Sequence, residues 1–432
     1  MPFETQAGAP KRIAVIGGGI SGMGAAHLLA RQHHVTLFES EKRLGGHART
    51  LLAGKRGDQP VDTGFIVFNH ANYPYLTALF HELGVPVAKS NMSFGASIDG
   101  GRIEYGLSGL DAVFAQRRNA LRPAYLRMVR DILHFNKNAL AAADDPAMTV
   151  GELLDKLGTG RWFRDYYLLP FSGAIWSTPT QKILDFPARA MMEFFRNHAL
   201  LGYTGQHQWY TVQGGSVEYV SRLEAALTAQ GVDIRLGASI ASVTRAPLSV
   251  RVRPQRGLEE TFDEVVFATH SDDTLALLAD ADGRESQALG AIRYQPNEVV
   301  LHADETLMPK RRKCWSSWVY TETSGQTSDR IGLTYWMNSL QPIPHDDPMF
   351  VTLNSTRAIR ADKIYDMATF RHPVYDVGVL EAQDTLRAAN GTNRTWFCGA
   401  WMKNGFHEDG LSSAVDVAEA IGREANLALA AE

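Results

Sequence analysis

The residues with the most specific spacing for chemistry stand near the amino end, in the hexapeptide Gly17-Gly18-Gly19-Ile20-Ser21-Gly22. They fit the pattern G-x-G-x-x-G, in which the glycines allow a tight turn, a close approach of pyrophosphate and close helix–strand packing. A strand is expected before this turn, at residues 11–16, and a helix after it, at 20–32, whose free N–H groups suit phosphates. Glu39 ends a second expected strand, 34–39, where a carboxylate accepts hydrogen bonds from a ribose diol and repels a 2′-phosphate. This spacing predicts a dinucleotide site for FAD or NAD rather than NADP.

A second glycine pair separates FAD from NAD. Arg43-Leu44-Gly45-Gly46 follows Glu39 closely, which suggests a second approach of the backbone to the same extended ligand. FAD needs this approach more than NAD does. No second G-x-G-x-x-G follows a strand, so no separate NAD(P)H domain is expected to reduce a flavin.

The segments that carry these motifs resemble flavin-containing amine oxidases and phytoene-desaturase-like enzymes. They are KRIAVIGGGISGMGAAHLLA, RLGGHART, VDTGF and the ending WFCGAWMKNGFHEDGLSSAVDVAEAI. Further segments, among them FNHANYPYLTALFHELGVP, LLPFSGAIWSTP and IRYQPNEVVLH, resemble a bacterial subgroup of predicted NAD/FAD-binding proteins, and this resemblance runs from Lys11 to Gly422. Some members of that subgroup are associated with modification of membrane fatty acids, as flavin desaturases of methyl-branched acyl chains. The resemblance therefore implies FAD as the cofactor and an acyl chain as one class of substrate.

The resemblance also implies which residues hold the FAD. Those expected at the pyrophosphate and adenosine are Gly17, Gly19, Ile20, Ser21, Gly22, Glu39 and Val243. Those expected along the FAD and at its flavin end are Arg43, Gly45, Gly46, His47, Gly64, Phe65, Gly399, Asp409, Gly410 and Leu411. The closing helix, expected at 410–428, would point its N–H groups at the flavin and stabilise the anionic reduced ring.

Three departures from the family pattern put oxidation of amines in doubt. His47 stands where many amine oxidases have Arg. The lysine that holds a water near the flavin N5 in the family is missing from residues 295–303. His407 replaces the last tyrosine of the aromatic cage, and Tyr375 is the expected counterpart of the other cage residue.

His407 and Tyr375 are the expected catalytic residues. A neutral imidazole beside the ring could remove a proton while a hydride passes to the flavin, although His407 could equally order the turn at 404–409. Tyr375 could line the flavin face or belong to the core. Glu408 and Asp409 are expected to cap a helix rather than act as bases, and Cys398 is expected to be an inert buried thiol. No metal site is expected, because the 14 histidines show no ligand spacing.

Composition sets the class and the compartment. The chain has 432 residues, 45% of them hydrophobic and 21% charged, with a net charge of −4. These values are typical of a globular protein and give no reason to expect a nucleic acid partner. Two cysteines exclude a disulfide framework, and neither a secretory signal nor an apolar run long enough to span a bilayer is evident. We expect a cytoplasmic protein, with the inner face of the membrane as a place for peripheral binding.

The expected fold is α/β: a discontinuous Rossmann-like FAD-binding domain with an inserted helical and mixed-sheet substrate domain. The FAD-binding domain is expected at 11–75, 205–275 and 385–432, and the substrate domain at 76–204 and 276–384, after a flexible leader at 1–10. Strands are expected at 232–253, 262–269 and 394–399. Residues 111–143 and 148–230 are expected to be mostly helical, with breaks at Pro123, Pro146, Pro170, Pro179 and Pro187.

Two features of the substrate domain indicate a lipid. Residues 114–137 form a basic amphipathic pattern with six cations and one acid, and a second basic and aromatic cluster lies at 310–318. Such clusters suit an anionic membrane surface if they share one side of the molecule, and otherwise form a solvated face. The apolar, aromatic stretch 162–176, with Phe186, Met191, Met192, Phe194, Phe195 and Trp209, forms either a tunnel for a long apolar chain or ordinary core.

The sequence thus predicts an FAD-dependent oxidoreductase that transfers a hydride from an apolar substrate to flavin N5, specifically a desaturase of lipid fatty acyl chains. Two alternatives stay open. One is an amine oxidase, which needs a polar or anionic pocket. The other is a flavin-binding partner subunit of a lipid-modifying enzyme.

Overall fold

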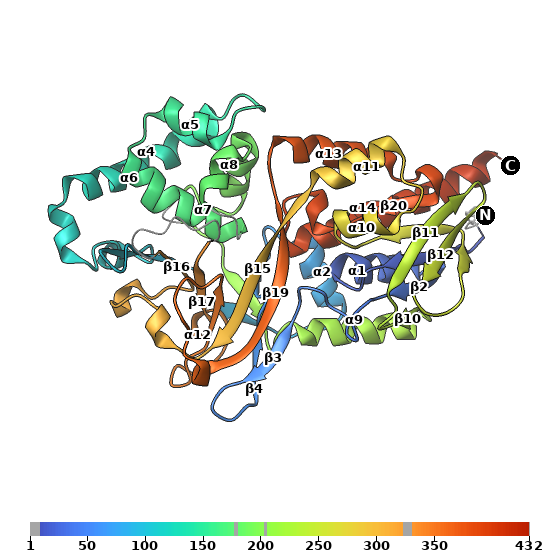
Figure 1. The fold of residues 1–432 in the computed structure, drawn as a ribbon, viewed down its shortest axis with the longest axis horizontal. Helices are drawn as coiled ribbons and strands as arrows, with labels where there is room; N and C mark the ends of the chain where they lie inside the picture. The colour runs from blue at the N-terminus through green and yellow to red at the C-terminus, as the bar shows by residue number, and fades with distance from the viewer. Residues whose placement is uncertain (1–8, 177–179, 203–204, 323–330, 432) are drawn as a thin grey trace, which may run out of the picture.

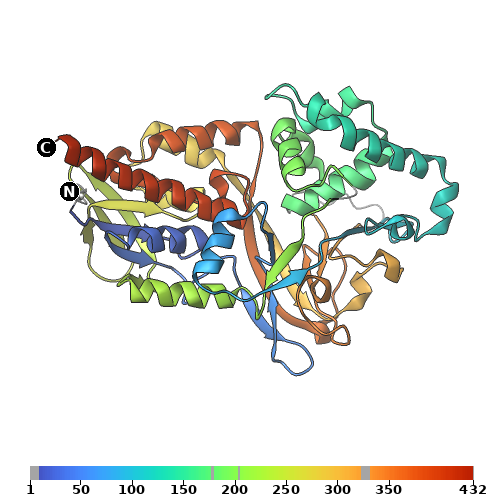
Figure 2. The same cartoon turned by 180° about the vertical axis from the view of Figure 1, so that it is seen from behind.

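The computed structural model describes residues 9–176, 180–202, 205–322 and 331–431, so the predicted leader lies, except for Ala9 and Pro10, outside the described residues. The chain forms two lobes side by side (Figure 1). We call the lobe with both chain ends the nucleotide lobe and the other the substrate lobe. The same arrangement is visible from behind (Figure 2).

A five-stranded sheet in which all neighbours run parallel is the centre of the nucleotide lobe. In spatial order its strands are β10 (Asp233–Arg235), β2 (His34–Phe38), β1 (Arg12–Ile16), β14 (Glu264–Phe267) and β20 (Thr395–Phe397). The last four residues of β1 and of β2 are buried, as expected of parallel strands covered on both faces. Segments from the start, middle and end of the sequence therefore build one sheet, and the predicted α/β fold with a discontinuous Rossmann-like lobe is confirmed.

Helices α1 (Ile20–Leu29), α9 (Val217–Ala229) and α14 (His407–Ala431) pack beside this sheet, with α1 between the other two (Figure 2). A Cβ at Gly22 would overlap the carbonyl oxygen of Gly17. Only glycine therefore lets α1 start this close to the turn after β1, as the spacing predicts. A Cβ at Gly24 would overlap the Leu411 side chain, so α1 and α14 also lie in close contact.

An antiparallel sheet of β11 (Ile240–Ala246), β12 (Ser249–Pro254) and β13 (Glu260–Phe262) stands at the outer end of the nucleotide lobe (Figure 1). Helices α10 (Ser271–Leu277), α11 (Gly283–Ala291) and α13 (Val377–Ala389) lie in the same lobe. Helix α11 and the first part of α13 fall in the segment 276–384, which the sequence assigns to the substrate domain, yet α11 packs on α10 and α13 packs on β20. Helical periodicity locates a helix in the chain but does not tell which lobe receives it.

The substrate lobe contains a seven-stranded mixed sheet whose strands all fall within the predicted substrate segments. In spatial order they are β19 (Ile364–Val374), β15 (Arg293–His302), β18 (Phe350–Leu353), β17 (Leu333–Trp336), β16 (Trp318–Thr321), β7 (Phe94–Ile98) and β8 (Ile103–Gly106). The long antiparallel pair β15 and β19 runs between the lobes (Figure 1). Smaller sheets pair β3 (Thr50–Ala53) with β4 (Gln59–Asp62), and β9 (Trp209–Val212) with β5 (Val67–Asn69) and β6 (Val87–Ser90).

Helices cover the other side of the substrate lobe. They are α3 (Leu110–Val113), η1 (Arg117–Leu121), α4 (Pro123–Ala142), α5 (Val150–Leu157), α6 (Arg161–Phe163), α7 (Leu169–Trp176), η3 (Thr180–Asp185) and α8 (Ala188–Asn197). The chain's other helices are α2 (Pro74–Glu82), α12 (Met337–Leu340), η4 (Glu305–Leu307), η5 (Arg312–Cys314), η6 (Ala361–Lys363), η7 (Thr392–Arg394) and η8 (Ala400–Met402), of which α2 and η8 pack on α14. Within the described ranges, none of the helices combines the length and apolar character needed to cross a bilayer.

Two local expectations are wrong. Pro170 does not break the helix over 161–176, because the preceding turn, Arg164–Leu168, widens into a π-helix. A π-turn changes the hydrogen-bond partners just where proline lacks an N–H. Strand β9 lies inside 148–230, where helix was expected; it pairs with β5 and β6, which are remote in sequence. Pro179 lies outside the described residues.

Candidate functional site

The two glycine segments predicted to hold one ligand meet at the carboxyl edge of the parallel sheet. The N–H of Gly45 donates to the carbonyl of Gly18 at 2.8 Å, and Gly19 and Gly45 form an isolated parallel bridge. Arg43 lies beneath this contact and donates from Nη2 to the Gly46 carbonyl at 2.9 Å. Its side chain therefore fixes the shape of the second glycine loop.

Glu39 lies beside the glycine turn, as its spacing predicts. Its carboxylate is buried and accepts hydrogen bonds from the N–H of Gly18, at 2.6 Å, and from the N–H of Glu41, at 2.7 Å. A carboxylate has further lone pairs, so these bonds leave capacity for a diol. The charge is placed to receive a ribose at the end of β2.

The carboxyl-terminal motif joins this turn from the other side. Gly410, in the first turn of α14, lies against Ser21 and Ile20 of α1. The N–H of Gly399 donates to Ser413 Oγ at 2.9 Å, which ties the loop after β20 to the same helix, and the Leu411 side chain packs on α1. The amino ends of two helices therefore meet beside the glycine loops, and both present uncompensated N–H groups.

These residues fit an FAD. No atom lies within 4 Å of the position that a Cβ on Gly19 would take, so the amino end of α1 faces open space. Gly19, the residue before α1, has no side chain that could cap the helix, and the first turn of the helix contains no acidic residue. Phosphate oxygens can therefore reach the N–H groups without displacing a protein group.

Two other residues predicted from the sequence are deeply buried. Val243 has no exposed surface, and its carbonyl accepts a hydrogen bond from the N–H of Ala279. A contact of Val243 with adenine stays a prediction. Cys398 is also fully buried, and burial raises the pKa of its thiol to about 12, as expected of an unreactive cysteine.

We call the two glycine loops, Glu39 and the amino ends of α1 and α14 the cradle. A cavity of about 940 Å³ begins beside the cradle and extends under the helices of the substrate lobe. Residues at its inner end are His47, Gly64, Phe65, Tyr375 and His407. Tyr167, Phe171, Ile175, Trp176, Phe194 and Trp209 also line it. The predicted stretch 162–176 thus contributes to a cavity, whereas Phe186, Met191, Met192 and Phe195 are buried in the core.

The lining of this cavity is mostly apolar and aromatic. Within the part of the chain that the structure describes, none of the lining residues is Asp, Glu, Lys or Arg. The polar groups are hydroxyls, amides and imidazoles. Such a cavity binds an uncharged chain without leaving a charge unpaired.

Gly64 allows the two flavin-end segments to approach each other. A Cβ at this position would overlap the His47 carbonyl, and the N–H of Phe65 donates to the same carbonyl at 3.0 Å. The Phe65 ring then stacks on His407, with 3.9 Å between ring centroids and 11° between planes. The predicted residues His47, Phe65 and His407 are thus brought together.

His407 is held by a residue that the sequence reasoning missed. Its Nε2 lies 2.6 Å from the hydroxyl of Tyr219, on α9. Burial, with a smaller contribution from His47, lowers the pKa of His407 to about 3. The ring is therefore neutral at cellular pH, but such a low pKa makes it a weak base.

Two further imidazoles stand near His47, and neither was predicted. The His47 ring centroid is 5.5 Å from that of His372 and 5.7 Å from that of His270. Burial lowers the pKa of His47 and of His372 to about 3, and that of His270 to about 4. His372 Nδ1 lies 2.8 Å from the Nδ2 of Asn297, on β15, in the segment from which the family's lysine is missing.

Tyr375 lies at the inner end of the cavity, beside Gly405. Its hydroxyl is buried and has no hydrogen-bond partner among the described residues. Burial raises the pKa of this phenol well above its usual value, so it stays protonated and can donate to a ligand.

Glu408 and Asp409 cap backbone groups. Glu408 accepts hydrogen bonds from the N–H groups of Tyr75 and Leu76, at the start of α2, so the helix that it caps is not its own. Asp409 accepts from the N–H of Phe406 at 2.9 Å, and burial raises its pKa to about 6.

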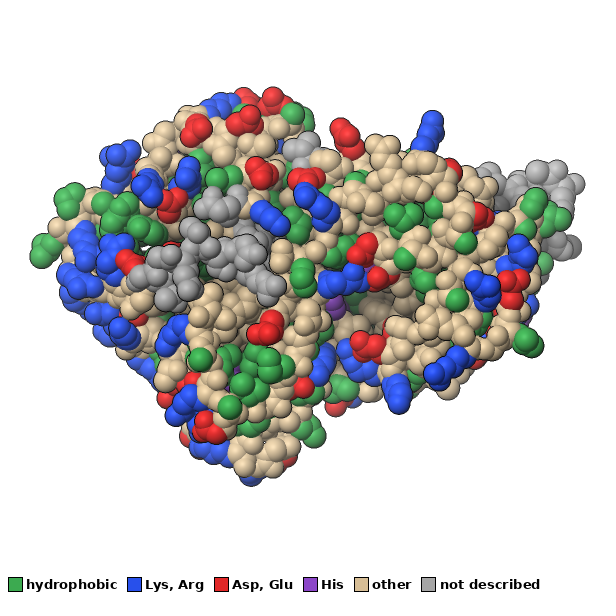
Figure 3. Space-filling model, viewed as in Figure 1, with side chains coloured by type: hydrophobic (Ala, Val, Ile, Leu, Met, Phe, Trp, Pro, Cys, Tyr) green, Lys and Arg blue, Asp and Glu red, His purple; other side chains and the backbone are tan. Residues whose placement is uncertain are grey.

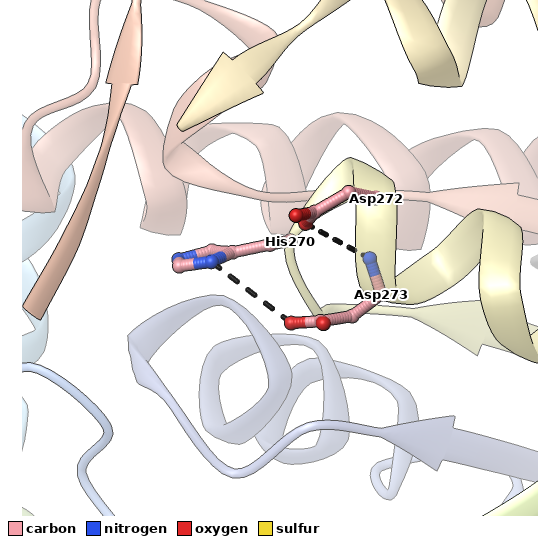
Figure 4. Close-up of side chains that lie close together, drawn as sticks. All are labelled: His270, Asp272 and Asp273. Atoms are coloured by element: carbon pink, nitrogen blue, oxygen red, sulfur yellow. Dashed lines mark hydrogen bonds and ion pairs between the residues drawn. The ribbon is translucent and has the colours of Figure 1, made fainter. Parts of the chain in front are cut away.

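One group of potential metal ligands, His270, Asp272 and Asp273, lies among the described residues (Figure 4). Their ligand atoms are within 4.8 Å of one another. Arg371 donates to both carboxylates, at 2.6 Å for Asp272. The guanidinium neutralises the acids that a cation would need, so the group is better described as an ion pair at the start of α10.

Comparisons with known proteins agree with this geometry. The family profile described as flavin containing amine oxidoreductase matches residues 20–348. A 49-residue stretch is 45% identical to L-amino-acid oxidase from Bothrops pauloensis and spans 11% of this chain and 10% of that enzyme. The chain thus matches about a tenth of the length of this curated relative.

Solved structures share the fold over nearly the whole chain. A fatty acid isomerase from P. acnes that produces CLA superposes with a TM-score of 0.66 at 15% identity, over 96% of this chain and 98% of that one. Cyclohexylamine oxidase from Brevibacterium oxydans gives 0.66 at 14% identity, over 96% and 99%. Putrescine oxidase bound to putrescine gives 0.63 at 15% identity, over 98% and 99%. At these identities the likeness establishes the fold and leaves the substrate open.

Proposed function

The chain belongs to the family of flavin-containing amine oxidoreductases and is an FAD-dependent oxidoreductase, and from this premise we propose that it desaturates a fatty acyl chain of a lipid. Desaturation removes two hydrogens from neighbouring saturated carbons, one as a hydride and the other as a proton, and leaves a carbon–carbon double bond. FAD, when bound, supplies the two-electron acceptor for this step. The chain's own residues must hold the acyl segment at the flavin end and take up the proton.

The observation that carries the proposal is the absence of charge along the cavity. Among its described lining residues there is no carboxylate to pair with an ammonium and no cation to pair with a carboxylate. Its volume of about 940 Å³ is at the upper end of the range of about 300–1,000 Å³ usual for small-molecule sites. A long uncharged chain with its polar group outside fits these properties better than a small charged amine.

The inner end of the cavity can receive the proton. His47, His372 and His407 are neutral there, because burial lowers the pKa of each to about 3. An imidazole with this pKa does not keep a proton at neutral pH and passes it on to solvent. The Tyr375 phenol stays protonated, so it contacts the substrate and does not act as a base.

Oxidation of an amine is the second candidate. Tyr375 and His407 both lie at the inner end of the cavity, where the resemblance implies an aromatic cage, and two structural neighbours are amine oxidases. The fatty acid isomerase has the same fold, so the fold favours neither substrate. The missing lysine and the uncharged lining argue for the lipid.

Anaerobic single-turnover reduction tests the proposal. The purified protein with FAD is mixed with detergent-dispersed phospholipids carrying saturated or methyl-branched chains, or with a panel of primary and secondary amines. We expect the visible flavin band to bleach with lipids and a new double bond to appear in the recovered acyl chains. Bleaching by amines alone would overturn the proposal in favour of amine oxidation. Bleaching by neither panel would favour a partner subunit whose flavin is structural.

A further inference from the structure

The outer end of the substrate lobe carries a concentration of positive charge. Residues 110–137 and 310–313 contain ten Lys and Arg residues against only two acids, in a chain whose net charge is −4. Figure 3 shows Lys and Arg side chains gathered along this edge, next to hydrophobic ones. We call the exposed side chains of these two segments the cationic face.

The two segments are one surface, although residues 138–309 separate them in the sequence. Asp111 on α3 binds Arg117 through Oδ1 and Lys313 through Oδ2, the latter at 2.6 Å. Arg311 binds Glu104, on the neighbouring strand β8, at 2.6 Å. The two basic clusters therefore lie on the same side of the molecule, the condition under which the sequence favours a membrane surface.

Helix α4 contributes a mixed leucine and cation stripe without exposed acids. Its only acid, Asp131, is buried and accepts a hydrogen bond from the N–H of Gly160 at 2.8 Å. Arg127, Arg130 and Lys137 are exposed on its outer side. Leu126 and Leu133 on the same helix are 45% and 52% exposed.

Exposed leucines continue along the neighbouring elements. Leu110 on α3 is 79% exposed, and Leu121 on η1 is 85% exposed. The one exposed acid among these leucines and cations, Asp111, is paired with Arg117 and Lys313. Exposed leucines interspersed with cations suit insertion into the headgroup region of an anionic bilayer. Nucleic acid would use the cations but not the leucines.

The cavity opens onto this same face. Leu110 and Leu133 both line the cavity and are exposed at the surface, whereas His47, Phe65 and His407 line its opposite end. One passage thus connects the cationic face with the flavin end.

We propose that the cationic face docks on an anionic lipid bilayer and that an acyl chain enters the cavity directly from the bilayer, between Leu110 and Leu133. The phosphate of the headgroup stays outside, against the arginines of α4 and η1, and the apolar chain extends inward. Docking itself follows from the surface alone, whereas entry of the acyl chain rests on the proposed function.

The chain offers a matched control surface at the opposite end of the molecule. On the segment between β12 and β13, Leu258 is 86% exposed, and Arg253 and Arg256 are exposed nearby. This surface lies in the nucleotide lobe, next to Glu259 and Glu260, and does not line the cavity.

Flotation of the FAD-loaded protein with vesicles tests the docking. We expect binding to phosphatidylglycerol vesicles, little binding to phosphatidylcholine vesicles, and loss of binding at about 1 M salt, where the Debye length is about 3 Å. The variant Arg118→Glu, Leu121→Asp, Lys137→Glu is expected to bind phosphatidylglycerol vesicles at least about 25-fold more weakly, because it removes two cations and each cation near such a surface is worth about a factor of five. The control variant Arg253→Glu, Arg256→Glu, Leu258→Asp makes the same charge change and is expected to bind as the original protein does. Both should keep their FAD and their far-UV spectrum.

Failure of docking and failure of the proposed function give different results. If the original protein does not bind phosphatidylglycerol vesicles, or both variants lose binding equally, the docking surface is wrong, even where detergent-dispersed lipid bleaches the flavin. If vesicles bind as expected but no lipid in any form bleaches the flavin, docking stands and the proposed substrate is wrong.

Entry of the acyl chain from the bilayer has its own test. It predicts that the flavin of the variant in the cationic face bleaches normally with detergent-dispersed lipid and slowly with vesicles. Equal rates with vesicles for the two variants would overturn entry from the bilayer.

Discussion

At the carboxyl edge of the parallel sheet, backbone lies directly against backbone, whereas under helices α4 and α7 the side chains leave a volume of about 940 Å³. In the cradle, Gly22 contacts the Gly17 carbonyl, and Gly45 donates a hydrogen bond to Gly18. In the cavity, Ile175, Phe171 and Val129 need only be apolar and of suitable size. The two regions should therefore respond to substitution in opposite ways: the cradle to a single added carbon, the cavity to added charge.

The largest effect is expected at Gly22. Gly22→Val places side-chain carbons where the Gly17 carbonyl stands, so α1 must move away from the glycine turn. We expect loss of bound FAD and a fall in the free energy of unfolding of about 3 kcal/mol or more. Flavin absorbance of the purified protein and urea unfolding measure these two quantities.

Gly422 is the matched control, because it lies on α14 and no atom stands within 4 Å of its Cβ position. Gly422→Ala should keep FAD and stabilise the protein by about 1 kcal/mol, through helix propensity alone. Equal losses in both variants would contradict a specific close approach at the cradle.

The next largest effect is expected in the cavity. Ile175→Glu adds a carboxylate to a lining without charges, and we expect flavin reduction by dispersed lipid to slow by about 100-fold or more, because an unpaired buried charge costs several kcal/mol. The FAD content should not change. Ile175→Leu, which keeps the volume, should stay within about threefold. If Ile175→Glu instead accelerated bleaching by amines, the cavity would be an amine site.

Glu39→Gln tests the polar part of the cradle. Replacing the charged acceptor at the end of β2 should weaken FAD binding about 10- to 100-fold, as expected for a hydrogen bond to a charged group. Titration of the apoprotein with FAD measures the dissociation constant. Glu41→Gln, at an exposed neighbour that pairs with Arg43, should leave it almost unchanged. An equal loss there would mean that general charge, rather than the position of Glu39, sets the affinity.

The difference between the two regions also explains what the sequence could predict. The cradle is local: Gly17 to Gly22 follow β1 directly, and Glu39 ends the next strand. A close approach between backbone segments is visible in the sequence as a glycine pattern, because few other residue types permit it. The closing helix, expected at 410–428, is observed as His407–Ala431, since its apolar periodicity and its glycine turn are local signals too.

The cavity depends on contacts between distant residues. Tyr219 meets His407 across 188 residues of sequence, and Asn297 meets His372 through the pairing of β15 with β19. Tyrosine and asparagine are common on helices and strands, so nothing in their local sequence marks these partners. The stretch 162–176 shows what the sequence cannot predict. Its composition shows that it is apolar, but the elements that face it decide whether it lines a cavity or packs in the core.

A smaller effect is expected for the imidazoles of the cavity. His407→Gln removes a ring that is bonded to Tyr219 and already has a low pKa, and His47 and His372 stand nearby. We expect lipid-dependent flavin reduction to slow by less than about tenfold, against the 10²- to 10⁴-fold typical when a general base is removed. Stopped-flow bleaching measures the rate. A loss of about 1,000-fold would make His407 the base that the sequence predicts.

The smallest effect is expected in the dependence on pH, and it again separates cradle from cavity. The pKa values of His47, His372 and His407 are lowered from 6.5 to about 3, so these rings are neutral throughout pH 5–8 and add no ionisation there. The stability that they contribute is complete above pH 6.5 and is lost as the pH falls toward 3. Asp409, at the cradle, behaves differently: burial raises its pKa from 3.8 to about 6, so its contribution is complete below pH 3.8 and is lost as the pH rises through 6.

A charged Asp409 at the amino end of α14 should oppose the anionic reduced flavin, so flavin reduction should slow by about two- to threefold as the pH rises through 6. The step should vanish in Asp409→Asn and persist in His407→Gln. A step near pH 6.5 that disappears in His407→Gln would instead place the titrating group in the cavity. It would require an imidazole that is much better solvated than the buried ring stacked on Phe65.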